Sequence, residues 1–162
     1  MEQNIKIALY NAPVGTLLIK YEDDAVVFLQ KTTEALQADQ PTALSELVFH
    51  QLDEYFAGKR TSFDFPFRLK GTPFQIQVWE ALQKIPYGEV RSYQDLAASI
   101  GRPTAWRACG SAAHANPIAI AIPCHRVIGK YGSLLGYSGG VEMKQALLKL
   151  ENAQIPAYKG SV

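Results

Sequence analysis

A cysteine followed by a histidine and an arginine forms the most reactive stretch of this chain. Residues 122–127 read Ile-Pro-Cys-His-Arg-Val, so Cys124 precedes His125 and Arg126. Two electropositive neighbours are a setting that lowers a thiol pKa and favours the nucleophilic thiolate. Consecutive side chains in an extended segment point apart, so contact between Cys124 and His125 requires a tight turn or a bridging water. Taken alone, the Cys-His pair is therefore only a weak indication of a nucleophilic cysteine.

The remaining cysteine and histidines do not suggest a second site. The chain has two cysteines and three histidines, and their spacings match neither C-x-x-C nor H-x-x-x-H, so we predict no metal. A disulfide is not expected in a reducing compartment. We interpret Cys109 as a small buried apolar residue and His50 as a structural residue on a helix.

The residues before Cys124 predict a series of short helices. Thr72 and Pro73 are a typical helix start, followed by apolar residues at helical spacing up to residue 85. Ser92 can cap a helix that ends near residue 101, and a further helix is expected over 103–113. Two short helices joined by a turn with a glycine form a helix-turn-helix pattern, which many helical domains share.

The helix expected over 103–113 has two different faces. One is a stripe of small apolar residues: Ala105, Ala108, Cys109 and Ala112. The other carries Thr104, Arg107, Ser111 and His114. Small residues let a helix approach a groove closely, and a long cation can enter it. An ordinary solvated face is the alternative interpretation.

The segments on either side of Cys124 differ in amino-acid composition. Residues 118–122 are an apolar run, which predicts a buried strand or extended segment. Five glycines lie between residues 129 and 140, and glycine permits positive φ and close ligand approach. We favour a pocket wall there over a plain hairpin loop, because Tyr137 and Ser138 stand between glycines. Residues 143–151 predict a helix that ends at Glu151.

The first part of the chain predicts a β-meander and a helix. Residues 4–10, 16–22 and 25–30 are short apolar segments separated by turn residues. Residues 41–57 have helical apolar spacing and stop before Gly58, and residues 62–69 are expected to be extended.

The predicted secondary structure changes from strands to helices near residue 71, where we place a domain boundary. A chain of 162 residues with 48% hydrophobic residues suits one compact domain or two small ones. The expected fold class is α+β, with a small N-terminal antiparallel sheet domain with a helix (1–70) and a mostly helical C-terminal domain with a helix-turn-helix (71–162).

Charge and hydropathy bear on whether the protein binds a polyanion, crosses a membrane or is secreted. Residues 1–70 carry seven Lys/Arg and ten Asp/Glu, whereas residues 71–162 carry nine and five. A polyanion would therefore bind the second half, although chance explains so mild an imbalance equally well. No stretch approaches the ~20 apolar residues that cross a bilayer, and no secretory signal is evident. We expect a cytoplasmic protein without membrane partners.

The pattern around Cys124 resembles the O6-alkylguanine-DNA alkyltransferases, also known as methylated-DNA–protein-cysteine methyltransferases. The match continues in register through most of 71–162, and its further segments are Tyr87-Gly88-Glu89-Val90-Arg91-Ser92-Tyr93, Arg107, Asn116-Pro117, Gly136-Tyr137-Ser138-Gly139-Gly140 and Glu151. The N-terminal part agrees only in style, as a variable ribonuclease-H-like domain. The C-terminal part would be winged-helix-like.

The resemblance implies direct-reversal DNA repair. Cys124 would take the alkyl group from O6-alkylguanine, with O4-alkylthymine as a second candidate substrate, in one irreversible turnover without a cofactor. His125 would act as a base through a water, and Glu151 would orient the His125 imidazole. Together with Cys124 they would form a catalytic triad of nucleophile, base and orienting carboxylate. Asn116 would brace the turn that presents the thiol. Tyr93 would hydrogen-bond to the purine as it leaves.

The resemblance also implies how the damaged base is read. An alkylated guanine must leave the duplex to reach a pocket. The backbone carbonyls of Cys124 and Val127 would accept from its exocyclic amine, and the Ser138 amide would donate to O6. Tyr137 would complete the substrate-binding set.

Duplex binding would use the helix with Arg107, placed in the minor groove with little sequence preference. Arg107 would fill the space that the extruded base leaves. The other implied DNA contacts are Thr104, Ala105, Ser111 and His114. The protein would act as a monomer. Two departures are Trp106, where family members usually carry a small residue, and Ala119, where some have proline.

Three other functions compete with this one. A non-catalytic lesion-binding protein would keep the DNA-binding face but lack Cys124. A helix-turn-helix regulator would explain Arg107 and leave the Cys-His-Arg segment and Glu151 without a role. A cysteine hydrolase would need an oxyanion hole, for which the sequence offers no case.

Overall fold

The computed structural model describes residues 4–129, 132–134 and 136–155. The chain divides into two compact units, Met1–Leu69 and Lys70–Val162. Within the described ranges, none of the helices has both the length and the apolar character that a bilayer-spanning segment requires.

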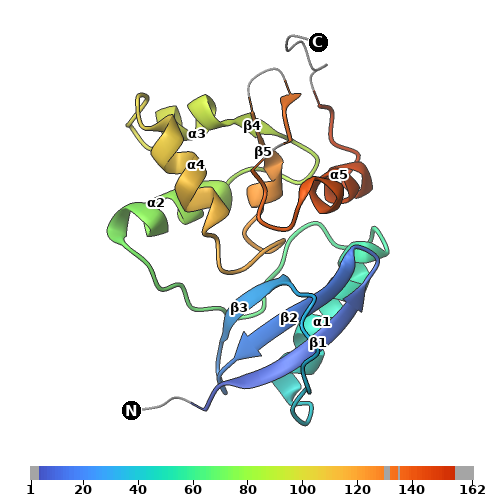
Figure 1. The fold of residues 1–162 in the computed structure, drawn as a ribbon. Helices are drawn as coiled ribbons and strands as arrows, with labels where there is room; N and C mark the ends of the chain where they lie inside the picture. Colours follow the sequence, from blue (N-terminus) through green and yellow to red (C-terminus); the bar gives the residue numbers. More distant parts are fainter. Residues whose placement is uncertain (1–3, 130–131, 135, 156–162) are drawn as a thin grey trace. The chain divides into compact units, whose positions relative to one another are not determined.

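The first unit is a three-stranded antiparallel sheet with one helix (Figure 1). Its elements are β1 (Lys6–Ala12), β2 (Gly15–Tyr21), β3 (Val26–Lys31) and α1 (Ala43–Phe56), with the strands in the order β1-β2-β3. This confirms the predicted N-terminal antiparallel sheet with a helix.

The core of this unit comes from the central strand and one face of α1. Leu17 and Ile19 of β2 are fully buried, as are Val48, Leu52 and Tyr55 of α1, which recur at helical spacing. The segment 62–69 pairs with the sheet only through one parallel bridge, between Val26 and Phe67.

The second unit is mostly helical, as predicted. Its elements are α2 (Pro73–Leu82), β4 (Arg91–Ser92), α3 (Tyr93–Ser99), α4 (Trp106–His114), the 3₁₀ turn η1 (Cys124–Arg126), β5 (Val127–Ile128) and α5 (Val141–Leu150). The helices α3 and α4 form the helix-turn-helix corner, and both pack on α2 (Figure 1).

The starts of α2 and α3 follow the predicted capping residues. Thr72 and Ser92 each accept a hydrogen bond from the backbone three residues on, which completes a capping box. In contrast, α4 begins three residues after Pro103, so Thr104 and Ala105 precede the helix. The reason is local: the Ala105 N–H donates to Arg102 O at 2.9 Å, which makes residues 102–105 a separate turn.

The apolar run 118–122 is buried but is not a strand or extended segment, contrary to our expectation. The Ile122 N–H donates to Ile118 O at 3.0 Å, and Ile120 has a φ of 72°. The chain therefore closes on itself in a tight turn. The side chain of Asn116 bonds the Ile118 N–H and the Ile122 carbonyl, and so satisfies a backbone group at each end of the turn.

Candidate active site

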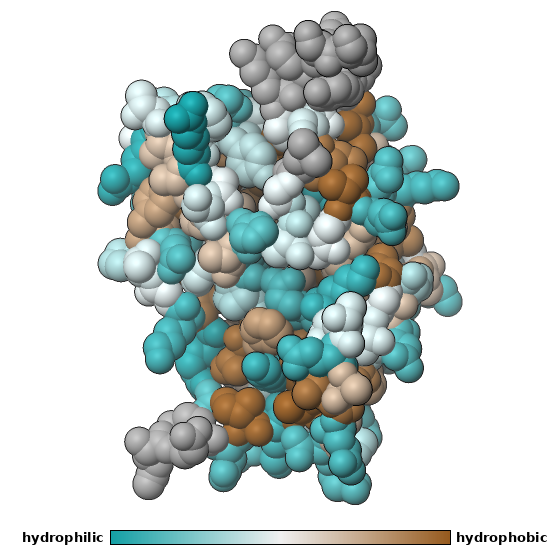
Figure 2. Space-filling view, viewed as in Figure 1, coloured by the Kyte–Doolittle hydropathy of each residue, from teal (hydrophilic) through white to brown (hydrophobic). Residues whose placement is uncertain are grey.

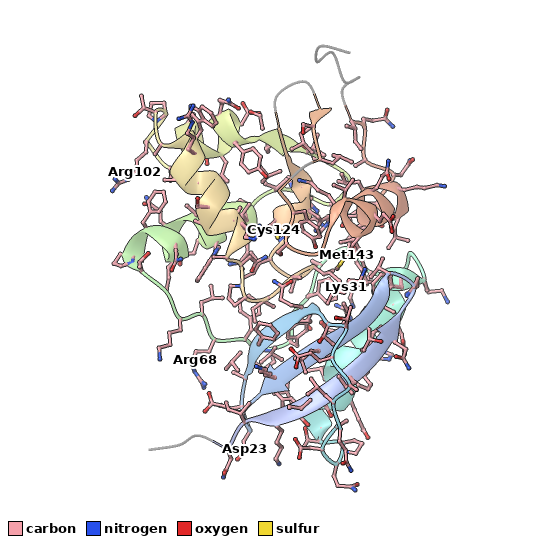
Figure 3. The ribbon with its side chains drawn as sticks, viewed as in Figure 1. Asp23, Lys31, Arg68, Arg102, Cys124 and Met143 are labelled. Carbon is pink, nitrogen blue, oxygen red and sulfur yellow. The ribbon has the colours of Figure 1, made fainter. Side chains whose placement is uncertain are left out.

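The turn that carries Cys124 is held together by one asparagine. The Asn116 Nδ2 atom donates to Ile122 O at 2.8 Å and to Cys124 Sγ at 3.1 Å, while Oδ1 accepts from the Ile118 N–H at 2.9 Å. Cys124 begins the turn η1 and is only 4% exposed. Figure 3 shows it between α4 and α5. Asn116 thus fixes the backbone before the thiol and also contacts the sulfur.

Glu151, at the end of α5, joins the two residues that follow Cys124. Its carboxylate accepts from His125 Nε2 at 2.7 Å and from Arg126 Nε and Nη2 at 2.8 and 3.0 Å. All three side chains are buried. Burial alone would raise the pKa of Glu151, but the hydrogen bonds and charges of His125 and Arg126 outweigh it and hold the pKa well below its usual value.

Burial favours the neutral form of the His125 imidazole. Burial lowers its pKa, and the hydrogen bond to Glu151 offsets this only in part. Since Nε2 faces the carboxylate, Nε2 carries the proton and Nδ1 holds the free lone pair. Nδ1 is buried and has no hydrogen-bond partner among the residues that the structure describes.

The Cys124 thiol is in a different setting from the one that its sequence neighbours suggest. Burial raises its pKa, and the Asn116 hydrogen bond and the charge of Lys144 counteract this only in part. Our expectation that His125 and Arg126 lower the thiol pKa is wrong, because both side chains turn towards Glu151. The sulfur therefore rests as a thiol near neutral pH.

Lys144 of α5 is the residue that the sequence analysis missed. Its side chain is fully buried, and Nζ donates to Val127 O. Burial lowers its pKa to about 8, although the nearby Cys124 acts in the opposite direction. In the described part of the chain, no carboxylate lies within ion-pair distance of it. The helical spacing of the sequence could have indicated that this lysine is buried, because Lys144 lies on the same stripe of the helix as Leu147, Leu148 and Glu151.

A narrow cavity, too small for a water molecule, lies beside the sulfur. It is lined by Cys124 and by Tyr93, Ala113, His114, Gly136, Tyr137, Ser138 and Lys144. A groove of about 490 Å³ adjoins it, lined by Tyr93, Trp106, Arg107, Gly110, Ser111, His114 and Gly136. Tyr93, His114 and Gly136 line both, so the groove ends at the wall of the cavity that contains the cysteine. A larger groove along α2 and α3 contains no cysteine or histidine.

Of the expected substrate-binding residues, Tyr137 and Ser138 line this cavity, whereas Val127 lies on strand β5. Val127 is paired in parallel with Arg91, which places β5 beside the start of α3 and Tyr93. Its carbonyl accepts from Lys144 and keeps a second lone pair for a ligand. Tyr137 is buried, whereas Ser138 is exposed at the rim.

The expected DNA-binding residues lie at the groove and at the start of α4. Arg107, Ser111 and His114 are exposed on α4, and Thr104 and Ala105 form the preceding turn. His114 Nδ1 lies 2.9 Å from Gly136 O, so this ring ties the end of α4 to the cavity wall.

These features define a class of protein: a helix-turn-helix unit with a buried Asn-Cys-His-Glu site at the end of a surface groove. Residues 5–69 match the ribonuclease-like domain, and residues 73–153 the DNA binding domain, of 6-O-methylguanine DNA methyltransferase. The chain belongs to this family.

Individual relatives agree along almost the whole chain. A methylated-DNA–protein-cysteine methyltransferase of Mycolicibacterium paratuberculosis is 44% identical over 94% of this chain and 96% of its own. The constitutive enzyme of that name from Bacillus subtilis is 45% identical over 86% and 90%. The crystal structure of Mycobacterium tuberculosis OGT in complex with DNA has a TM-score of 0.82 at 45% identity, covering 92% and 94%.

Proposed function

We propose that this chain repairs DNA by direct reversal, moving a methyl or larger alkyl group from O6 of guanine onto its own Cys124. Membership of the family supports the reaction class. The observation that carries the residue assignment is the buried arrangement in which Asn116 contacts the sulfur and Glu151 bonds His125 Nε2, while Nδ1 has no partner among the described residues. O4-alkylthymine is a second candidate substrate.

The reaction begins with a protonated thiol, because burial raises the pKa of Cys124. His125 Nδ1 takes the thiol proton through a water, and Glu151 stabilises the imidazolium that forms. The thiolate, favoured by the Lys144 ammonium, attacks the alkyl carbon in line. A carbon–sulfur bond forms, the bond from carbon to O6 breaks, and its electron pair leaves with guanine. The Tyr93 hydroxyl, hydrogen-bonded to the purine, eases protonation of that anion.

Recognition of the base rests mainly on backbone groups at the cavity. The carbonyls of Cys124 and Val127 accept from the exocyclic amine, the Ser138 amide donates to O6, and Tyr137 forms the wall. A base extruded from the duplex is read by its edge in this way. The groove along α4, which ends at the wall of the cavity, is the route by which it enters.

Duplex DNA binds along α4 through the minor groove, and Arg107 fills the space of the extruded base. Thr104, Ala105, Ser111 and His114 lie close to the phosphates and sugars. The protein acts as a cytoplasmic monomer, and its own thiol is the acceptor, so the reaction requires no cofactor.

Intact-mass and peptide analysis after reaction with an oligonucleotide that contains O6-methylguanine tests the proposal. We expect one methyl group per protein, on the peptide with Cys124, even with the lesion in large excess, because a thioether is stable. Cys124→Ser should transfer nothing yet still bind the lesion, and Cys109→Ser should react like the parent. Methylation elsewhere, or many turnovers per molecule, would refute the assignment.

A further inference from the structure

Trp106 is a large aromatic side chain that is partly exposed at the surface. It is the first residue of α4 and is 36% exposed. Among the large hydrophobic residues that the structure describes as exposed, it alone is aromatic. It lines the groove that ends at the wall of the Cys124 cavity. Figure 2 shows hydrophilic and weakly hydrophobic colours side by side over the part of this face that contains α3 and α4.

The ring is in contact with the cation next to it in the chain. The Arg107 guanidinium lies over the indole, 4.9 Å from its centroid, within the range of a cation–π interaction. The described groove lining includes Arg107 and no carboxylate, so the groove suits an anionic partner. An exposed aromatic ring beside an arginine is also the combination on which nucleic-acid bases stack.

We propose that Trp106 is a further DNA-contacting side chain of α4, whose indole stacks on a nucleotide adjacent to the lesion. In the free protein the indole holds the Arg107 guanidinium. When duplex DNA binds, Arg107 leaves the ring for the space of the extruded base, and the indole face becomes available to a base or sugar. This inference rests on the proposed function and adds a wedge of the type that minor-groove proteins insert.

Tryptophan fluorescence tests the contact directly, because the chain has only two tryptophans. Trp79 is 2% exposed, and its Nε1 donates to Ala112 O at 2.8 Å. Quenching by acrylamide therefore reports mainly on Trp106. With Cys124→Ser protein and a duplex that contains O6-methylguanine, we expect bound DNA to protect Trp106 from acrylamide. In the added Trp106→Phe background, DNA should leave the Trp79 signal unchanged.

Affinity measurements form the second arm. Loss of one base–aromatic stack predicts about a tenfold weaker duplex affinity for Trp106→Ala, and a smaller loss for the aromatic control Trp106→Phe. The same Ala change should slow reaction with free O6-benzylguanine much less than reaction with duplex.

The possible outcomes separate the two proposals. If the parent binds duplex while Trp106 stays fully accessible to acrylamide, or if Trp106→Ala binds like the parent, the Trp106 contact is overturned and the proposed function stands. If the parent binds no duplex at all, the proposed function fails and the contact fails with it.

Discussion

At the scale of single residues, the charge on Lys144 is the most unusual feature of the site. A buried ammonium that bonds one carbonyl and no carboxylate is costly, since its pKa falls to about 8 from 10.5. A methionine would fill the same stripe of α5 at lower cost. The cost is consistent with a functional role, which is to favour the Cys124 thiolate.

Replacement of this lysine should therefore separate stability from activity. We expect Lys144→Met to raise the free energy of unfolding by about 2 kcal/mol at pH 7 and to slow methyl transfer about tenfold. Lys149→Met, on the exposed side of the same helix, should change neither much. Chemical denaturation and single-turnover rates check this.

The pH dependence gives a further readout of the same change. Because the folded pKa of Lys144 is lowered, the unfolded chain binds the extra proton between about pH 8 and its ordinary value. The stability gain of Lys144→Met should therefore be constant below pH 8 and shrink as the pH rises above it. A variant less stable than the parent at pH 7 would indicate a structural role instead.

At the scale of elements, sequence predicts helix starts well when the cap is a local interaction. Thr72 and Ser92 cap α2 and α3 through residues three positions away, so the signal lies within four residues. The start of α4 was misplaced because a turn at Arg102 competes with the proline signal. The run 118–122 was misassigned because apolarity alone cannot distinguish a buried strand from a buried turn.

The turn around Asn116 leads to a prediction about this element. Asn116→Ala leaves the Ile118 N–H, the Ile122 carbonyl and the sulfur without their partner. We expect a loss of about 2–4 kcal/mol in unfolding free energy and a rise in the pKa of Cys124, visible as an alkaline shift of the pH–rate profile for thiol alkylation. An unchanged profile would show that the turn positions the sulfur without this side chain.

The helix α4 carries a prediction about DNA. Arg107→Ala should reduce repair of duplex O6-methylguanine by about a hundredfold, because no side chain then fills the space that the extruded base leaves in the DNA duplex. Reaction with free O6-benzylguanine, which needs no extrusion, should fall far less. Arg102→Ala, which removes an exposed cation that packs on Phe74 instead, is the matched control. Equal losses on both substrates would contradict the extrusion role.

At the scale of the whole molecule, the buried Glu151 cluster should govern acid stability. The lowered pKa of Glu151 contributes stability that is complete above its unfolded value near 4.5 and is lost as the pH falls below it. The lowered pKa of His125 adds a loss as the pH falls below about 6.5.

The variant Glu151→Gln tests this directly. We expect it to be less stable by about 3 kcal/mol at pH 7, because Arg126 remains buried without its carboxylate. Its unfolding free energy should also change less between pH 5 and pH 3 than that of the parent. An acid profile parallel to the parent's would assign the sensitivity to other carboxylates. Thermal and urea denaturation across this range make the comparison.

From the sequence alone we predict correctly the α+β class, the sheet strands and two of the helix starts, while Cys124 stays a predicted nucleophile. These follow from periodicity, local caps and a short motif, all of which act within a few residues. Only the folded chain brings His125 and Arg126 to the same Glu151 carboxylate, buries Lys144 beside Cys124 and raises the thiol pKa. Those properties depend on burial and on contacts between residues some 25 positions apart, and electrostatic effects of burial appear only once the chain has folded.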